Sequence, residues 1–435
     1  MNSDSKDLQA FKGSILFFTD DPDLVGADQA VRYYEEGLLL VESGFVKAVG
    51  DFDELNPTLP SDAEVTDYSG QLIIPGFVDT HIHYPQTDII ASYGKQLLDW
   101  LENYAFPREG MFSDPAYAEE VAEFFLQELA RNGTTTAQVM STVHEHAADI
   151  LLQKSLEKNL RLITGKTLMN CNAPEYLLDG PSMGFDSSLK LAEKWHGIGR
   201  LSYAVTPRFA VTSTESQLEK AAELFHSRQG LYLHTHLSEN LNEIEMIRTL
   251  FPWSEDYLDV YERFELVGPR ATFAHAIHLS DSEIDRLAIS GSSVSFCPTS
   301  NLFIGSGLFN LERVTAAGIP VGMATDIGGG TSFSMLKTLA EAYKVLQLQG
   351  QSLSAMKAFY LATLGGARAL GLADQIGSFL PGREADFTVL NVNATPLIER
   401  RIAVTQTLEE RLFVLMMLGD DRSITQTHIM GKTAL

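Results

Sequence analysis

The segment Pro75-Gly-Phe-Val-Asp-Thr-His-Ile-His83 places two histidines, His81 and His83, at the end of a short apolar run. Residues two apart on a β-strand point to the same face of the sheet. The segment therefore predicts a buried strand whose carboxyl end directs two imidazole rings toward one point. Because neutral imidazole is a common metal ligand, this strand end is a candidate metal site.

Seven further apolar, β-rich runs follow, and loops and stretches of helical periodicity separate most of them. The eight runs are Phe77–His83, Thr134–Met140, Arg161–Met169, Leu201–Thr206, Leu231–His236, Ala271–His275, Ser292–Cys297 and Ile319–Asp326. Apolar residues at three- and four-residue spacing predict helices over Ala116–Asn132 and Glu215–Gln229. Eight alternating units are typical of a parallel (β/α)8 barrel, so we predict an α/β fold of this type.

Metal-binding residue types end four of the eight runs. His81 and His83 end the first run, His236 the fifth, His275 the sixth and Asp326 the eighth. A barrel collects its active site at the carboxyl ends of its strands. One histidine at such a place would be an ordinary hydrogen-bonded residue, but the whole set at equivalent positions favours a metal centre. Nitrogen and oxygen ligands suit zinc, with iron or manganese as alternatives.

The two ends of the chain follow another pattern. From about Phe11 to Ile74, short apolar runs broken by turn residues predict β-hairpins, and this pattern returns at Asp386-Phe-Thr-Val-Leu-Asn-Val. Two all-β ends therefore flank the barrel.

Composition excludes several classes of function. The formal net charge of −25 repels the phosphate backbone of nucleic acids and anionic lipid surfaces. Two cysteines, Cys171 and Cys297, are too few for a disulfide framework or a cysteine-rich zinc site, and they favour a reducing cytosol. The polar start of the chain and the lack of a long apolar window predict neither export nor membrane insertion.

With these residues at these positions, the sequence resembles the amidohydrolase superfamily over nearly its full length. That superfamily combines a His-x-His pair, histidines on strands five and six and an aspartate on strand eight. Further motifs resemble the guanine deaminases within it: Pro85-Gln86, Leu98-Asp-Trp-Leu, Tyr104-Ala-Phe-Pro, Pro207-Arg-Phe, His234-Thr-His-Leu-Ser-Glu and Cys297-Pro-Thr-Ser-Asn-Leu. The resemblance implies a distorted barrel over residues 75–378 and a small β-sandwich built from residues 1–74 and 379–435. It also implies a cytoplasmic homodimer that hydrolyses guanine to xanthine and ammonia with a zinc-activated hydroxide.

The resemblance also implies roles for individual residues. His81, His83, His236 and Asp326 would bind one zinc ion, and Asp326 would also take part in catalysis. Glu239 would carry a proton from water to a purine ring nitrogen and then to the departing amine. His275 would orient the attacking hydroxide. Related binuclear enzymes carry a bridging lysine on a middle strand, and Lys166 lies on run three, but run four ends in Ala204-Val-Thr-Pro-Arg without one, so we predict a single metal.

The residues that would contact guanine are predicted from the hydrogen-bonding groups of the base. Arg208 carries only donors, and O6 and N7 of guanine are adjacent acceptors. Gln86 supplies both donors and an acceptor for another edge of the purine, while Phe209 and Trp100 would form apolar walls; His236 and Glu239 would also contact the substrate. A surface carboxylate is the alternative partner of Arg208, and a solvent-facing position at a helix start is the alternative for Glu239.

Other histidines are interpreted as less important. His234 and His278 are predicted to support the site structurally, and the remaining five, His144, His146, His196, His226 and His428, to be surface residues. Two alternative functions stay open: deamination of another nucleobase, a modified nucleoside or a triazine, and a catalytically inactive assembly protein of the same fold.

Overall fold

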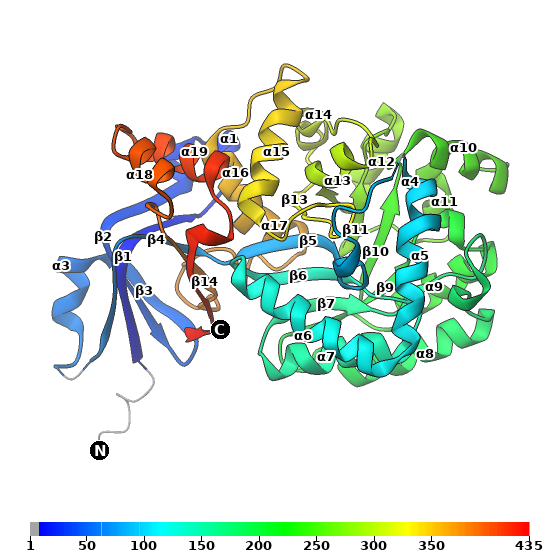
Figure 1. Cartoon of the computed structure of the whole chain (residues 1–435), viewed down its shortest axis with the longest axis horizontal. Helices are drawn as coiled ribbons and strands as arrows, with labels where there is room; N and C mark the ends of the chain where they lie inside the picture. The colour runs from blue at the N-terminus through cyan, green and yellow to red at the C-terminus, as the bar shows by residue number, and fades with distance from the viewer. Residues whose placement is uncertain (1–7, 62, 95, 435) are drawn as a thin grey trace.

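The computed structural model describes residues 8–61, 63–94 and 96–434 (Figure 1). Its right half is a barrel and its left half is a sheet to which both ends of the chain contribute. The expectation of no export signal rests partly on the polar start of the sequence. These residues, 1–7, lie outside the described residues. No described helix is long and apolar enough to cross a bilayer.

Eight parallel strands form the barrel, in the order β5, β6, β7, β9, β10, β11, β12, β13. Closure depends on the segment after β13, because the Asp326 N–H donates to the His81 carbonyl (3.0 Å) and the His83 N–H to the Ile327 carbonyl (2.9 Å). The strands are β5 (Phe77–His83), β6 (Thr134–Met140), β7 (Arg161–Gly165), β9 (Leu201–Pro207), β10 (Tyr232–Leu237), β11 (Ala271–His275), β12 (Ser293–Phe296) and β13 (Val321–Met323), and the short β8 (Thr167–Leu168) pairs with β9. The predicted barrel is confirmed.

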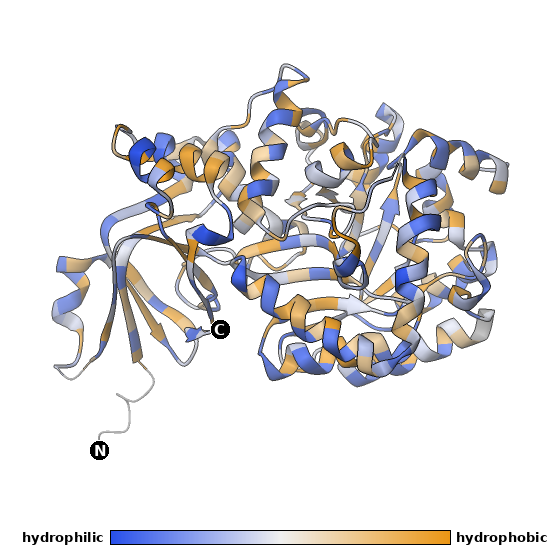
Figure 2. Ribbon diagram, viewed as in Figure 1, coloured by the Kyte–Doolittle hydropathy of each residue, from blue (hydrophilic) through white to orange (hydrophobic). Residues whose placement is uncertain are grey.

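Helices cover the outside of the barrel (Figure 1). Helix α6 (Pro115–Arg131) shows why: Asp114 caps its first turn, Pro115 occupies the first helical position, and its buried residues recur at three- and four-residue spacing. Figure 2 shows the same alternation of hydrophilic and hydrophobic residues on the outer helices. The other barrel helices are α4 (Leu97–Trp100), α5 (Phe106–Gly110), α7 (Glu145–Glu157), α8 (Pro181–Trp195), α9 (Glu215–Ser227), α10 (Leu241–Leu250), α11 (Tyr257–Arg263), α12 (Asp281–Ser290), α13 (Pro298–Phe303), α14 (Leu311–Ala316), α15 (Met335–Gln347), α16 (Ala355–Tyr360) and α17 (Gly366–Ala369).

Both ends of the chain share one seven-stranded sheet, in the order β16, β15, β14, β4, β1, β2, β3. Only β1 and β4 run parallel in it. Its strands are β1 (Leu8–Phe18), β2 (Val31–Glu42), β3 (Phe45–Asp51), β4 (Val65–Pro75), β14 (Phe387–Leu390), β15 (Ile424–Ile429) and β16 (Lys432–Thr433), and its helices are α1 (Pro22–Val25), α2 (Ala27–Ala30), α3 (Phe52–Leu55), α18 (Pro396–Ile402) and α19 (Leu408–Leu418). The fold class is thus confirmed, while the limits at residues 74/75 and 378/379 stay a prediction.

Two predictions from the sequence need correction. The last barrel strand ends at Met323, so Asp326 lies in the following loop, where its positive φ of 50° cannot continue a strand. His428 is not a surface residue: it is 3% exposed, its ring stacks on Phe387, and its Nε2 lies 2.9 Å from the Tyr68 hydroxyl. The last three residues of β15, which include this histidine, are all buried in the sheet.

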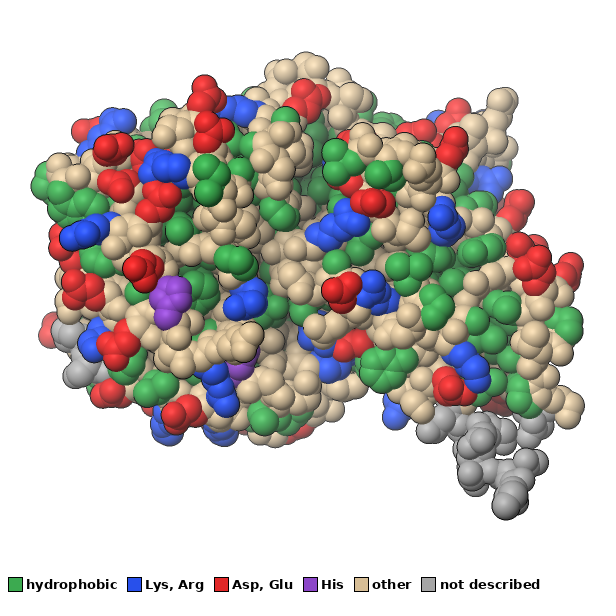
Figure 3. Space-filling model, turned by 180° about the vertical axis from the view of Figure 1, so that it is seen from behind, with side chains coloured by type: hydrophobic (Ala, Val, Ile, Leu, Met, Phe, Trp, Pro, Cys, Tyr) green, Lys and Arg blue, Asp and Glu red, His purple; other side chains and the backbone are tan. Residues whose placement is uncertain are grey.

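Charged side chains of both signs are interspersed on the face of the molecule seen in Figure 3. Between the barrel and the sheet, charges are instead buried as pairs. Glu384 accepts hydrogen bonds from Arg161 (Nε, 3.0 Å) and Arg200 (Nη2, 2.6 Å), and Arg200 also contacts Asp386. These four side chains are at most 10% exposed. A paired buried charge is tolerated, whereas an unpaired one is costly.

We expect Glu384→Ala to lower the free energy of unfolding by about 3–5 kcal/mol, because two buried guanidinium groups lose a shared carboxylate. Denaturant unfolding of the full chain measures this effect. Glu145→Ala is the control, since that glutamate pairs with the exposed Lys190 and should leave the unfolding midpoint unchanged. Equal midpoints for both variants would contradict the prediction.

Candidate active site

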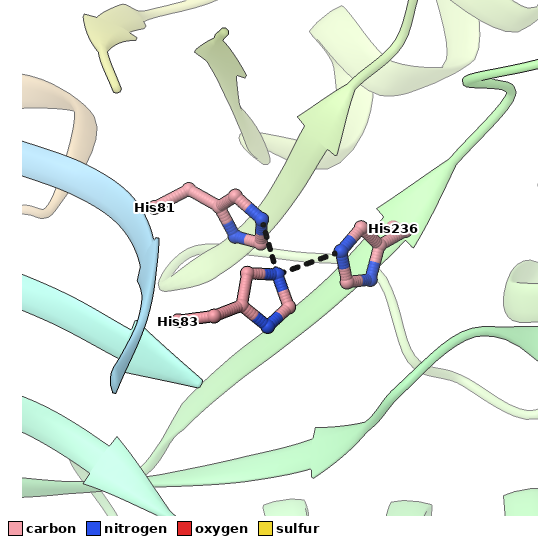
Figure 4. A group of neighbouring side chains, drawn as sticks. All are labelled: His81, His83 and His236. Atoms are coloured by element: carbon pink, nitrogen blue, oxygen red, sulfur yellow. Dashed lines mark hydrogen bonds between the residues drawn. The ribbon is translucent and has the colours of Figure 1, made fainter. Parts of the chain in front are cut away.

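Three imidazole rings meet at the carboxyl end of the barrel strands (Figure 4). The Nε2 atom of His83 lies 3.1 Å from Nε2 of His81 and 3.2 Å from Nε2 of His236. His81 and His83 come from β5 and His236 from β10, as predicted, and all three rings are buried. The i, i+2 spacing on β5 therefore produces the convergence that the sequence predicts.

Asp326 and His275 complete the cluster. The Asp326 Oδ1 atom lies 3.2 Å from His81 Nε2 and 3.5 Å from His83 Nε2. His275 Nε2 lies 3.6 Å from Asp326 Oδ2, and its Nδ1 lies 2.9 Å from the Asn301 side-chain oxygen. The ligand atoms of His81, His83 and His236 form one compact group, and those of His81, His275 and Asp326 form a second. All five residues that the sequence analysis identified at the ends of the apolar runs thus lie together.

The cluster has the chemistry of a cation site. The Nδ1 of His236 lies 2.6 Å from the Arg208 carbonyl, and because a carbonyl only accepts, this nitrogen carries the hydrogen and Nε2 keeps its lone pair. Burial lowers the pKa of His83 and of His236 well below the ordinary value, which favours neutral rings. Lone pairs and a carboxylate that converge in a buried space are stabilised by a bound metal ion. The residues therefore fit a divalent metal.

Two further histidines, His234 and His278, are predicted from the sequence to support the site structurally. His234 places Nε2 2.6 Å from Nδ1 of His81, on the side of that ring away from His83 Nε2. A contact of this kind holds a ligand ring in orientation. His278 places Nε2 2.8 Å from the Ser306 carbonyl. His234 thus contacts a ring of the cluster, whereas His278 contacts Ser306, which donates to Glu239; neither histidine belongs to the two compact groups.

Glu239 lies three residues after His236 and turns back into the cluster. Its side chain is 4% exposed, so the alternative of a solvent-facing glutamate is wrong. Ser306 donates to Oε1 (3.0 Å), while Oε2 lies 3.5 Å from His275 Nε2. Burial raises the pKa of Glu239. Glu243, in the capping box of α10, accepts from the Glu239 N–H (2.9 Å) and so fixes the backbone that carries Glu239.

One pocket opens on this cluster. Every residue predicted to contact guanine lines it: Gln86, Arg208, Phe209, His236, Glu239 and Trp100. Leu97, Leu101 and Ile304 add apolar surface, and His83, His275 and Asp326 face it from the metal cluster. Apolar walls around a set of convergent polar groups are typical of a small-molecule site.

Lys166, the possible bridging residue, lies elsewhere. Its ammonium pairs with Asp179, and it is absent from the described residues that line the pocket. Burial acts to lower the pKa of Lys166 below its usual value. Among the residues that the structure describes, no lysine lines the pocket that opens on the cluster.

The sequence did not identify Glu109, which is fully buried beside the pocket. Nη1 of Arg208 donates to both of its carboxylate oxygens (2.8 and 2.7 Å), and Nε2 of Gln86 donates to Oε1 (3.1 Å). Arg208 therefore does pair with a carboxylate, but with a buried one rather than one at the surface. The only signal in the sequence was the position of Glu109 two residues after the Tyr104-Ala-Phe-Pro motif.

Comparison with known proteins agrees with this site. A family model described as "Amidohydrolase family" matches residues 72–434. Guanine deaminase from Escherichia coli K12 is 49% identical over 435 residues, which are 99% of each chain. The solved structure of E. coli guanine deaminase superposes with a TM-score of 0.96, covering 98% of this chain and 99% of the other. Guanine deaminase from C. acetobutylicum, solved with guanine bound in the active site, is 28% identical, with a TM-score of 0.89 and coverage of 98% and 99%.

Proposed function

The chain belongs to the amidohydrolase family, and from this premise we propose that it deaminates guanine to xanthine and ammonia. One observation carries the proposal: a single pocket holds both the metal cluster with Glu239 and the polar pair Gln86 and Arg208. The first group can activate water, and the second can recognise a purine. Full-length similarity to guanine deaminases supports the same substrate.

His81, His83, His236 and Asp326 are proposed to hold one metal ion, zinc in preference to iron or manganese. When bound, zinc supplies an activated water at neutral pH, because it lowers the pKa of water to about 7. Lys166 pairs with Asp179 away from the cluster, which supports a single-metal site. The side chain of His275 lies against Asp326 and is proposed to orient the attacking water.

Glu239 is proposed to move the protons. Water oxygen bonds to C2 of guanine, the bond from C2 to the amino nitrogen breaks, and ammonia leaves without any change of oxidation state. Oε1 of Glu239 is occupied by Ser306, so Oε2, which faces His275, is free to accept a proton from the attacking water. The same oxygen can pass this proton to the ring nitrogen beside C2, and it can then carry the second proton of the attacking water from the new C2 hydroxyl to the departing amine.

Arg208 and Gln86 are proposed to read the part of the purine opposite the reacting carbon. Nη1 of Arg208 is held by Glu109, which leaves the other guanidinium donors for the adjacent acceptors O6 and N7. Adenine carries an amino group in place of O6, so a donor would be left unpaired at a cost of about 1–3 kcal/mol. Phe209 and Trp100 supply apolar walls for the ring.

A panel of nucleobases tests the proposed function. Purified protein is given guanine, adenine, cytosine and a triazine, ammonia release is followed, and metal content is measured on the same sample. We expect guanine to give the highest kcat/KM, with xanthine and ammonia formed in equal amounts by protein carrying one metal ion per chain. Preference for another base would contradict the guanine assignment, and a need for two metal ions would contradict the single-metal site.

The assembly and location of the chain are further proposals. We infer a homodimer, as the family resemblance implies, and a cytoplasmic location, which the small number of cysteines favours. Light scattering of the purified chain measures the first, and cell fractionation the second. A monomeric mass or a membrane fraction would contradict them.

A further inference from the structure

Glu109 is a buried carboxylate beside the pocket that the proposed chemistry does not use. We propose that it is the positioning residue for guanine recognition, because it fixes both side chains that face the purine. This inference rests on the proposed function, since it assigns Glu109 to the recognition step of that reaction. Three features support this role: the contacts of Glu109 with Arg208, its contact with Gln86, and its effect on the charge of the pocket.

The Arg208 side chain is held by Glu109 on one nitrogen and by an aromatic ring beside it. Nη1 reaches both carboxylate oxygens, at 2.8 and 2.7 Å, and Cζ lies 5.5 Å from the centroid of the Phe106 ring. Phe106 and Glu109 both belong to α5, so one short helix supplies both contacts. A planar guanidinium fixed in this way keeps its other donors in a defined direction. Glu109 thus selects the edge that Arg208 presents to the pocket.

The Gln86 side chain is fixed from both ends. Its Nε2 donates to Glu109 Oε1 (3.1 Å), and its Oε1 accepts from the Gly328 N–H (3.0 Å). The carboxylate cannot donate and the N–H cannot accept, so each contact forbids the flipped amide. Without Glu109, the amide keeps the Gly328 contact and a longer contact of Nε2 with His83 Nδ1 (3.4 Å). Glu109 therefore determines which hydrogen-bonding groups of Gln86 remain for substrate.

Charge gives Glu109 a second effect on recognition. The side chains of Arg208 and Glu109 are 3% and 0% exposed, so the positive charge is balanced where water does not screen it. An unbalanced buried guanidinium would attract an anion in preference to a neutral purine. The pair instead leaves a neutral set of donors, which suits neutral guanine.

A double-mutant cycle on the full, metal-loaded chain tests this inference. The four proteins are wild type, Glu109→Gln, Arg208→Gln and the double variant, and the readout is kcat/KM for guanine. We expect each single variant to lose about tenfold or more, because Glu109→Gln places an amide donor against a donor and Arg208→Gln leaves the buried carboxylate of Glu109 without its guanidinium partner. The double variant should lose less than the product of the two single losses, since Glu109 acts partly through Arg208 and partly through Gln86. Losses that multiply, or full activity in Glu109→Gln, would overturn the inference.

A matched control separates positioning from general stability. Asp21→Asn makes the same type of change in a buried ion pair outside the pocket, where Lys357 Nζ contacts both carboxylate oxygens at 2.8 and 2.6 Å. We expect this variant and Glu109→Gln both to lower the midpoint of thermal unfolding, but only Glu109→Gln to lower kcat/KM. Equal losses of kcat/KM in both would show that Glu109 acts through stability alone.

Two further outcomes keep the inference testable. If Glu109→Gln does not fold, Glu109→Asp replaces it, because the shorter side chain keeps the charge but withdraws the carboxylate; we then expect partial loss with the same dependence on Arg208. If wild type does not act on guanine, the proposed function fails, and the same cycle is run on whichever panel base is deaminated. Non-additive losses on that base would still support Glu109 as a positioning residue, and multiplying losses would still overturn it.

Discussion

Replacement of Glu239 with Gln is expected to reduce guanine deamination by about 10²–10⁴-fold while the metal stays bound, as loss of a general acid–base group typically does. The amide is almost isosteric and can still accept from Ser306, as Oε1 of Glu239 does at 3.0 Å. It cannot accept and return a proton. The loss should therefore appear mainly in kcat, with KM for guanine changed little.

Steady-state kinetics with metal analysis on the same preparation measure this result. Glu245→Gln is the matched control, because Glu245 is an exposed glutamate on the neighbouring helix α10 and lies outside the pocket. We expect the control to keep wild-type turnover. Unchanged kcat in Glu239→Gln would remove Glu239 from the mechanism, and loss of metal would show that it acts on the metal site instead.

The metal cluster could be predicted from the sequence because its residues occupy regular places in a repeated pattern. His81 and His83 share a strand face by spacing, and His236 and His275 lie in β10 and β11, near the ends of those strands. Only Asp326 departs from this rule, because the chain leaves the strand at Met323 and turns before it. The prediction still found it because the eighth predicted run extends to Asp326, and in the structure the loop returns this residue to His81 by a backbone hydrogen bond.

The contacts around the cluster could not be predicted in the same way. Glu109 and Arg208 are 99 residues apart, and Ser306 and Glu239 are 67 apart. Such pairs follow no local periodicity, since they depend on how loops from different barrel units pack against one another. In a chain with 57 acidic residues, nothing local distinguishes Glu109 from a glutamate at the surface. His428 illustrates the same limit, because its burial depends on stacking with Phe387 across two strands.

Replacement of Asp326 with Ala is expected to remove both the bound metal and the activity, in contrast to Glu239→Gln. Oδ1 of Asp326 lies beside Nε2 of His81 and Nε2 of His83, and Oδ2 lies beside Nε2 of His275. Among the described residues, Asp326 is the only carboxylate in the two metal-binding groups, so Ala leaves these groups with histidines alone. Changes to outer partners of a ligand typically cost about 10–100-fold in metal affinity, so loss of the ligand itself should cost at least that much. Guanine turnover should fall by at least the same factor.

Metal titration and thermal unfolding measure this effect together. A metal that binds only the folded state raises the unfolding temperature, and this increase should be large for wild type and small for Asp326→Ala at equal metal concentration. Asp281→Asn is a suitable control, because this carboxylate is exposed at the start of α12 and pairs with Arg313. A chelator should lower the unfolding temperature of wild type and of this control alike. If Asp326→Ala bound metal as tightly as wild type, Asp326 would not be a ligand, and the cation would have to be held by the histidines alone.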